Sequence, residues 1–293
     1  MISPKMEMYE DEELPETLEW YKDQIAGHHP SVVKNGIRQI GIVKEHGREH
    51  YLLKLVQDGK RGDSEVKFYE TIFGLNGTEH NEVQQLALVK LRDLVPLYFG
   101  KRTINIAGRG YEFIELEDIT YPFKKPCIMD IKIGQVTYDP DASEAKKVSE
   151  SAKCPFQKES GFRILGYRLH PDDHGNVRIE DKNWGRTRSH DNIQAAFEEY
   201  LQATPSIESK KKIVANFLES LSLITNWFDS QEVIQIYSSS LLFVYEGDST
   251  SDTPPVIKMI DFSHVYYEEK KDFNYIHGLN YITNQFKTIG SKI

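Results

Sequence analysis

The stretch Pro126–Gly134 constrains the fold of this chain most, because two charged residues interrupt an otherwise apolar run. Asp130 and Lys132 lie two positions apart among isoleucine and methionine residues. Side chains two apart on a strand point to the same face, so we predict that both charges emerge side by side. A buried charge is costly unless it is paired or used. The stretch is therefore either a functional polar strand or an edge strand whose charges face solvent.

A second strand and the helix that follows it carry another pair of charges. The strand His50–Val56 holds Lys54 alone among apolar neighbours, and the helix has Asp63 or Ser64 as its expected N-cap. Glu65 then lies in the first helical turn. Two interpretations stay open. Lys54 faces solvent while Glu65 complements the helix dipole, or the two residues pair, as a strand Lys and a helix Glu do in kinase-type folds.

The first part of the chain reads as a small antiparallel sheet with one helix against it. Strands are predicted over Gly36–Val43, Leu94–Gly100, Arg102–Ala107 and Tyr111–Leu116, besides the strand already named. Glu117–Ile119 leaves this sheet as a hinge. We expect residues 28–119 to form a nucleotide-holding N-lobe, and residues 1–27 to be an acidic, weakly ordered lead-in.

The region after the central strand is locally basic. From Glu144 to Arg188 there are ten Lys or Arg against seven Asp or Glu, a net charge of +3 in a chain of net charge −9. An anionic ligand needs such a local patch in an acidic protein, although ordinary charge fluctuation can also produce one. The long amphipathic helix predicted after Pro205 is expected to be core scaffold.

A hairpin near the C-terminus supplies a further carboxylate. The strands Tyr237–Tyr245 and Val256–His264 are joined by a loop rich in Gly, Ser, Thr and Pro. Asp261 comes at the end of the apolar part of the second strand. It either caps the following turn or binds Mg²⁺, like the Asp of the protein-kinase Asp-Phe-Gly triplet. Ser240 would lie on the neighbouring strand.

Composition and missing motifs exclude several classes. The net charge of −9 disfavours nucleic acid as a partner. The two cysteines form no disulfide framework or zinc motif, and no apolar run approaches the ~18 residues of a membrane helix. We expect an intracellular protein, cytoplasmic or nuclear or both, without membrane insertion or an obligate protein partner. Walker, His-Arg-Asp and protein-kinase Gly-rich motifs are absent, which disfavours a protein substrate.

Four motifs in order resemble the inositol polyphosphate kinase family. They are Leu-Leu-Lys followed by Arg-Gly-Asp-Ser-Glu-Val-Lys-Phe-Tyr-Glu, then Pro-Cys-Ile-Met-Asp-Ile-Lys-Ile-Gly, Ser-Ser-Leu-Leu, and Ile-Asp-Phe-Ser-His. The resemblance spans about Gly36 to Leu279. It implies a two-lobed, kinase-like α+β fold. Residues 28–119 would be the small antiparallel N-lobe, and residues 120–293 a larger α+β C-lobe with a short helical inositide-binding insert at about 141–163.

The resemblance also implies roles on the nucleotide side. Lys54 would bind the ATP phosphates, with Glu65 orienting it. The backbone at Glu117 and Ile119 would hold adenine, and Asp130 would contact ribose and help to position the reacting centre.

The remaining roles concern the metal and the acceptor. Lys132 would meet the acceptor oxygen and the transferred phosphoryl group, so Lys132 and Asp130 are the expected catalytic residues. Asp261, with Ser240 nearby, would hold Mg²⁺. Besides Lys132, the residues facing the inositol phosphates would be Arg61, Lys146, Lys153, Lys182 and His264.

The expected activity is that of an ATP- and Mg²⁺-dependent inositol phosphate kinase. Tyr-Ser-Ser-Ser-Leu-Leu and Lys153-Cys154 resemble the hexakisphosphate kinases, which make pyrophosphates, and this subclass is favoured. Residues 135–143 look closer to the inositol polyphosphate multikinases, which act on tris- and tetrakisphosphates and are the alternative. A non-catalytic inositide sensor on a kinase fold ranks lower, because Lys132 and Asp261 are both present.

Overall fold

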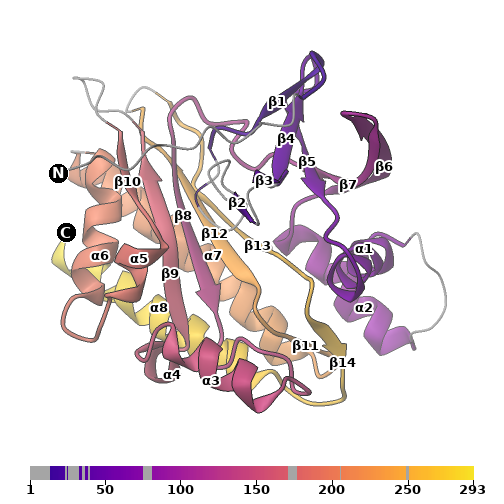
Figure 1. Cartoon of the computed structure of the whole chain (residues 1–293). Coiled ribbons are helices and arrows are strands. Elements are labelled where there is room, and N and C mark those ends of the chain that lie inside the picture. Colours follow the sequence, from indigo (N-terminus) through magenta and orange to yellow (C-terminus); the bar gives the residue numbers. More distant parts are fainter. Residues whose placement is uncertain are drawn as a thin grey trace, which may run out of the picture.

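Two five-stranded sheets, one in each lobe, organise the computed structural model of the protein (Figure 1). The structure describes residues 14–23, 25, 33–34, 37–38, 40–74, 81–170, 177–204, 206–248 and 251–293. Adjacent strands run antiparallel in both sheets, and helices accompany each sheet. The expected α+β, two-lobed architecture is confirmed.

The N-lobe sheet has the strand order β1-β4-β5-β7-β6. These strands are β1 (Leu18–Trp20), β4 (Ile42–Glu45), β5 (Tyr51–Leu55), β7 (Arg109–Glu117) and β6 (Tyr98–Ile106). β6 joins two predicted strands into one, because the break expected near Gly100 is a bulge in the ladder with β7. The predicted strand Gly36–Val43 is divided between β4 and β3 (Ile37–Arg38), which pairs with β2 (Val33–Lys34).

Helix α1 (Lys60–Ile72) begins earlier than its sequence suggests. The expected N-cap at Asp63 or Ser64 is wrong, since Gly59 occupies that position with a φ of 75°. Gly62 explains the early start: a Cβ there would lie 1.9 Å from the carbonyl oxygen of Gln57, so only glycine allows this close approach. The remaining helical segments of the lobe are α2 (Glu82–Leu91) and the 3₁₀ turn η1 (Arg92–Leu94).

The prediction of a weakly ordered lead-in over residues 1–27 is wrong for residues 14–23, which form part of the N-lobe. Residues 14–23 and Ile25 are described, and β1 pairs with β4 at the edge of the N-lobe sheet. Leu18 and Tyr21 are buried, which supplies the apolar contact that the acidic composition obscured. Residues 1–13, 24, 26 and 27 lie outside the described residues.

The C-lobe sheet has the strand order β10-β9-β8-β12-β13. These strands are β10 (Arg178–Glu180), β9 (Phe162–Leu169), β8 (Pro126–Ile133), β12 (Ser240–Glu246) and β13 (Val256–Ile260). β8 pairs with β9 on one side and β12 on the other, so it is a central strand and the edge-strand alternative is excluded.

The long C-lobe helices pack against one face of the C-lobe sheet. The C-lobe helices are α3 (Glu144–Ala152), α4 (Gln157–Ser160), α5 (Lys182–Arg186), α6 (Ile193–Tyr200), η2 (Leu201–Ala203), α7 (Ile207–Ser230) and α8 (Phe273–Lys292). Met129, Ile131 and Ile133 of β8 join the apolar core formed with α7 and α8. Asp130 and Lys132 therefore point to the opposite face.

The C-terminal hairpin is shorter than predicted where its first strand begins and where its second strand ends. β12 starts at Ser240, after Ser238 takes a φ of 58°, and β13 ends at Ile260, before Asp261 takes a φ of 64°. The residues on either side of the hairpin form a second, two-stranded antiparallel sheet of β11 (Ile234–Ile236) and β14 (Val265–Tyr267). Within the described part of the chain, no helix combines the length and apolarity needed to cross a membrane.

Candidate active site

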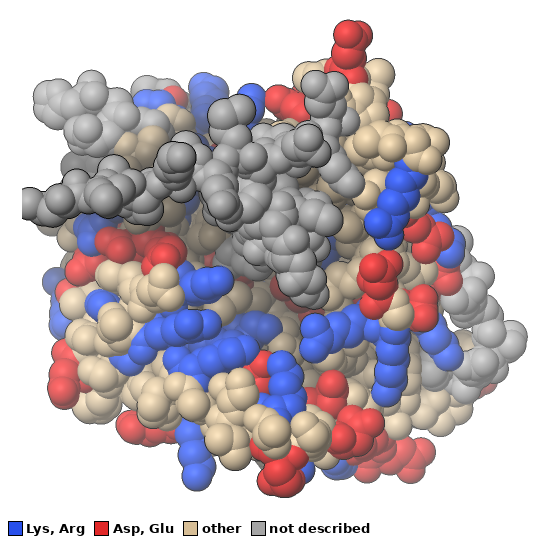
Figure 2. Space-filling model, viewed as in Figure 1, with Lys and Arg blue, Asp and Glu red and all other residues tan. Residues whose placement is uncertain are grey.

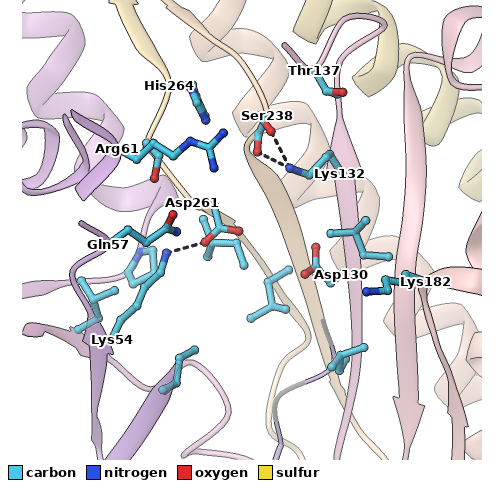
Figure 3. A pocket seen from close by; sticks show the side chains of 18 of the residues that line it. Lys54, Gln57, Arg61, Asp130, Lys132, Thr137, Lys182, Ser238, Asp261 and His264 are labelled. Atoms are coloured by element: carbon cyan, nitrogen blue, oxygen red, sulfur yellow. Dashed lines mark hydrogen bonds and ion pairs between the residues drawn. The ribbon is translucent and has the colours of Figure 1, made fainter. Parts of the chain in front are cut away.

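A cavity of about 470 Å³ contains most of the predicted site residues. Its walls come from β5 and the start of α1 in the N-lobe, from the hinge, and from β8, β12, α3 and α5 in the C-lobe. Figure 3 shows Lys54 and Asp261 on one side of this cavity and Asp130 across from them. Figure 2 shows Lys and Arg side chains gathered on the C-lobe surface of the same face.

The N-lobe wall is organised by one buried ammonium group. Lys54 Nζ lies 2.7 Å from Glu65 Oε1 and 2.6 Å from Asp261 Oδ1, which confirms the strand Lys to helix Glu pairing. Burial by itself would lower the pKa of Lys54, but the charges of Asp261 and Glu65 outweigh it and raise that pKa. Glu65 Oε1 also accepts the backbone N–H of Phe262 at 3.2 Å. These contacts tie α1 to the segment that carries Asp261.

Asp130 and Lys132 present two different environments on β8. The Asp130 side chain is buried and its Oδ1 has no hydrogen-bond partner among the described residues. Burial, followed by the charge of Asp261, raises the pKa of Asp130 to about 7. Lys132 Nζ donates to Ser238 Oγ at 2.6 Å and to the Ser238 carbonyl oxygen at 2.9 Å, while burial lowers its pKa. The left-handed turn at Ser238 thus fixes the position of this ammonium group.

The basic wall is arranged around one carboxylate. Glu150 of α3 contacts Lys146, lies 2.6 Å from Lys153 Nζ, and lies 3.9 Å from an Arg163 nitrogen. Burial acts to raise the pKa of Glu150, but hydrogen bonds from Lys146 and Lys153 outweigh it and lower that pKa to about 2. Glu150 stays ionised at neutral pH and holds three cations on one side of the cavity. Lys182 of α5 lines the same cavity.

His264 is held by a second carboxylate, Asp139, which lines the same cavity. Asp139 Oδ1 lies 2.6 Å from His264 Nδ1 and accepts the hydroxyl of Tyr266 at 2.7 Å. Because an ionised carboxylate only accepts hydrogen bonds, Nδ1 carries the proton and Nε2 is the ring nitrogen left for a ligand. Burial lowers the pKa of His264, and the positive charges of Arg61 and Lys132 lower it further. The Asp139 carboxylate acts to raise this pKa but does not outweigh them.

The hinge forms the remaining wall. Glu117 and Ile119 line the cavity on either side of Asp118. Asp118 binds Lys44 Nζ at 2.5 Å, and its backbone N–H donates to the carbonyl oxygen of His50 at 3.0 Å. These contacts join the hinge to β4 and to the start of β5.

The cavity contains all but two of the predicted site residues. Glu65 is buried behind Lys54, as an orienting residue would be, whereas Ser240 is fully buried beside Asp130 and Ser238 occupies the cavity wall instead. The structure therefore does not support Ser240 as a metal ligand. Asp118 lies in the predicted hinge, and Arg163 and Arg186 lie in the predicted basic region, although none of the three was assigned a role. Cavity residues that sequence reasoning missed are Gln57, Asp139, Glu150 and Ser238, among others. The spacing of Glu150 from Lys146 in α3 and from Lys153 at its C-cap was a signal for Glu150.

Known proteins match the chain in sequence and in fold. Inositol polyphosphate multikinase of Homo sapiens is 32% identical over 230 residues, which are 78% of this chain and 51% of that protein. Inositol hexakisphosphate kinase 3 of Mus musculus is 28% identical over 196 residues, which are 58% of this chain and 49% of that protein. The chain thus spans about half the length of these curated relatives.

A solved structure and a family model agree with these relatives. The fold resembles inositol phosphate multikinase from S. cerevisiae, crystallised with ADP and Mn²⁺, at a TM-score of 0.65 and 24% identity, covering 82% of this chain and 98% of that one. The family model "Inositol polyphosphate kinase" matches residues 113–287. That match includes β8 with Asp130 and Lys132, the basic wall and the hairpin that ends at Asp261, and we conclude that the chain belongs to the inositol polyphosphate kinase family.

Proposed function

We propose that the protein is an ATP- and Mg²⁺-dependent inositol phosphate kinase of the multikinase type, which transfers the γ-phosphate of ATP to a hydroxyl of a partly phosphorylated inositol. One observation carries the proposal: a single cavity joins the Lys54, Glu65 and Asp261 cluster on one wall to a basic wall on the other. Asp130 and Lys132 lie between them, on β8. Phosphoryl transfer depends mainly on positioning and on charge stabilisation, which is what such an arrangement provides.

On the nucleotide side, Lys54 binds the ATP phosphates and Glu65 keeps its ammonium group oriented. The hinge backbone at Glu117 and Ile119 holds adenine. Asp130 accepts a hydrogen bond from a ribose hydroxyl, which suits the buried Oδ1 without a partner among the described residues. A buried acceptor of this kind favours a ligand that completes its hydrogen bond.

Asp261 fits a magnesium site of the kind that nucleotides complete. The described residues contain no group of three or more His, Cys, Asp or Glu side chains that could hold a metal alone. Mg²⁺ is commonly bound by one or two carboxylates together with substrate phosphates and water. The Asp261 side chain is 43% exposed towards the cavity and meets this requirement. When bound, the ion would neutralise charge on the transferred group.

On the acceptor side, the basic wall and Arg61 of α1 bind the phosphates of the inositol. Arg61, Lys146, Lys153 and Lys182 supply cations, and His264 supplies its Nε2 atom. Lys132 contacts the acceptor oxygen and the phosphoryl group in transfer. A cation fixed there by Ser238 stabilises charge as it develops, without reorganising.

We favour the multikinase type over the hexakisphosphate kinase type that the motifs favoured. Support comes from the higher identity and coverage of the human multikinase, at 32% over 78% of this chain against 28% over 58%. A partly phosphorylated inositol is therefore the proposed acceptor, and inositol hexakisphosphate is the second candidate.

The test is a turnover assay of the purified chain with ATP and Mg²⁺, with inositol tris-, tetrakis- and hexakisphosphate compared at equal concentration. Products are identified by NMR. We expect turnover of the lower phosphates, and a loss of about 10²- to 10³-fold in the single-turnover rate of Lys132→Ala with nucleotide affinity retained. Turnover of the hexakisphosphate alone would reverse the subclass. Inositide binding without turnover would establish the sensor alternative.

A further inference from the structure

The segment just before the family motifs joins the N-lobe sheet. Residues 14–23 and Ile25, here called the N-terminal strap, include β1, which pairs with β4. The Tyr21 backbone N–H donates to the Ile42 carbonyl oxygen at 3.2 Å. Tyr21 is buried, and its hydroxyl lies 2.8 Å from Thr120 Oγ1 and 3.3 Å from Asp118 Oδ1. The strap is therefore anchored both to the sheet and to the hinge.

The same strap also contacts the C-lobe. The Asp23 carboxylate forms an ion pair with Arg168 of β9, and the two side chains are only 30% and 22% exposed. Arg168 also donates to the Lys22 carbonyl oxygen at 3.5 Å. Ile25 packs on the apolar cluster around Ile119 at the hinge.

Gly166 of β9 shows that this contact with the C-lobe is closely fitted. Its φ is +156°, and a Cβ on it would lie 2.8 Å from Ile25 Cγ2 and 2.5 Å from the Glu180 carbonyl oxygen. Only glycine leaves space there for Ile25. The strap thus crosses from one lobe to the other within a few residues.

Tyr21, Asp23 and Ile25 also line the cavity, together with the hinge residues Asp118 and Ile119. That end of the cavity is the one assigned to adenine under the proposed function. We propose that the N-terminal strap closes the nucleotide end of the cavity and holds the two lobes at the separation that nucleotide binding requires, with the Asp23–Arg168 ion pair as its attachment to the C-lobe. Asp23 and Arg168 are positioning residues in this proposal, which rests on the proposed nucleotide site.

A charge swap distinguishes this role from a direct effect of the two charges on the bound nucleotide. Asp23→Arg and Arg168→Asp each break the ion pair, and the double variant restores it with reversed polarity. Binding of a fluorescent ADP analogue is measured by anisotropy, alongside the KM for the inositol phosphate. We expect each single variant to weaken ADP binding about fivefold and the double variant to recover most of it, because a partly exposed ion pair is broken and then re-formed. The inositide KM is expected to stay unchanged.

The two single variants distinguish the explanations by sign. If Asp23 and Arg168 acted only through their charge on the anionic nucleotide, Asp23→Arg would strengthen ADP binding and Arg168→Asp would weaken it. That pattern would overturn the proposed role of the strap. A double variant that binds ADP as weakly as the single variants would overturn it too. Asp23→Asn is a smaller change on the strap itself and is expected to weaken binding in the same direction.

Lys22→Glu is the matched control, because Lys22 lies in the same strap, its side chain is 80% exposed, and its ammonium group pairs with the exposed Glu19 carboxylate. Its ADP affinity is expected to equal that of the wild type. Hydrogen exchange provides a second readout: amides of residues 18–23 should lose protection in the single variants and regain it in the double variant. Unchanged protection in the singles overturns the strap. A wild-type chain that binds no ADP overturns the proposed function, and this inference with it.

Discussion

Replacing Asp130 with Asn should stabilise the ligand-free protein, and the gain should grow with pH. Asp130 is 8% exposed, and burial followed by the Asp261 charge raises its pKa to about 7 from an ordinary 3.8. Below the ordinary value, both the folded and the unfolded chain carry a protonated carboxyl. As the pH rises from about 4 to about 7, the unfolded chain loses this proton first, so the wild type loses stability over that window.

The magnitude follows from the same pKa. About three powers of ten in proton affinity correspond to about 4 kcal/mol once Asp130 is ionised in both states, at 1.36 kcal/mol for each power of ten. Asn is neutral at every pH and avoids this cost. Between about pH 5.5 and about pH 8, the stability advantage of Asp130→Asn should therefore increase by about 2 kcal/mol. Any constant effect of the amide group cancels in this comparison.

The assay is urea unfolding of both proteins at the two pH values, without nucleotide or Mg²⁺, because a bound ligand would shift the apparent stability. Asp191→Asn is the control, since Asp191 is an exposed aspartate beside α6. Its free energy of unfolding relative to the wild type is measured at the same two pH values. If the difference between Asp130→Asn and the wild type changes no more than that of Asp191→Asn from about pH 5.5 to about pH 8, Asp130 is not a strained buried carboxylate and our reasoning is refuted.

Three further changes test other contacts of the cavity. Glu65→Gln should lower the free energy of unfolding by about 3 kcal/mol, because it leaves buried Lys54 with one carboxylate instead of two, and urea unfolding measures this; a change near zero would contradict a tight pair. Asp261→Asn should abolish turnover while circular dichroism shows an intact fold, since a Mg²⁺ site weakens without its carboxylate, and near wild-type rates would make Asp261 a structural residue. Lys153→Ala should raise the inositide KM several-fold, by on the order of 1 kcal/mol and less in high salt; a raised ATP KM with an unchanged inositide KM would place Lys153 in the nucleotide site.

Local patterns in the sequence predicted the elements that carry the chemistry. Alternation along Pro126–Gly134 placed Asp130 and Lys132 on one face of a strand, and β8 has that arrangement. The Lys54 and Glu65 pair was one of two interpretations that the strand and the following helix left open, and the family resemblance favoured it. Such patterns are reliable because the spacing of side chains on strands and helices depends only on backbone geometry. The same rule misplaced the start of α1, where Gly62 permits a close approach that no local pattern reveals.

The tertiary structure alone decided which of these faces meet. Lys54 and Asp261 are 207 positions apart and yet form an ion pair of 2.6 Å. Ser238 rather than Ser240 reaches the cavity, because the chain adopts a left-handed turn just before β12. Residues 14–23 form part of the fold although their composition is acidic, since β4 offers a sheet edge for β1 and Arg168 offers a partner for Asp23. Contacts between distant segments depend on how whole elements pack. A single sequence shows which face of each element is apolar, but not which other element that face packs against.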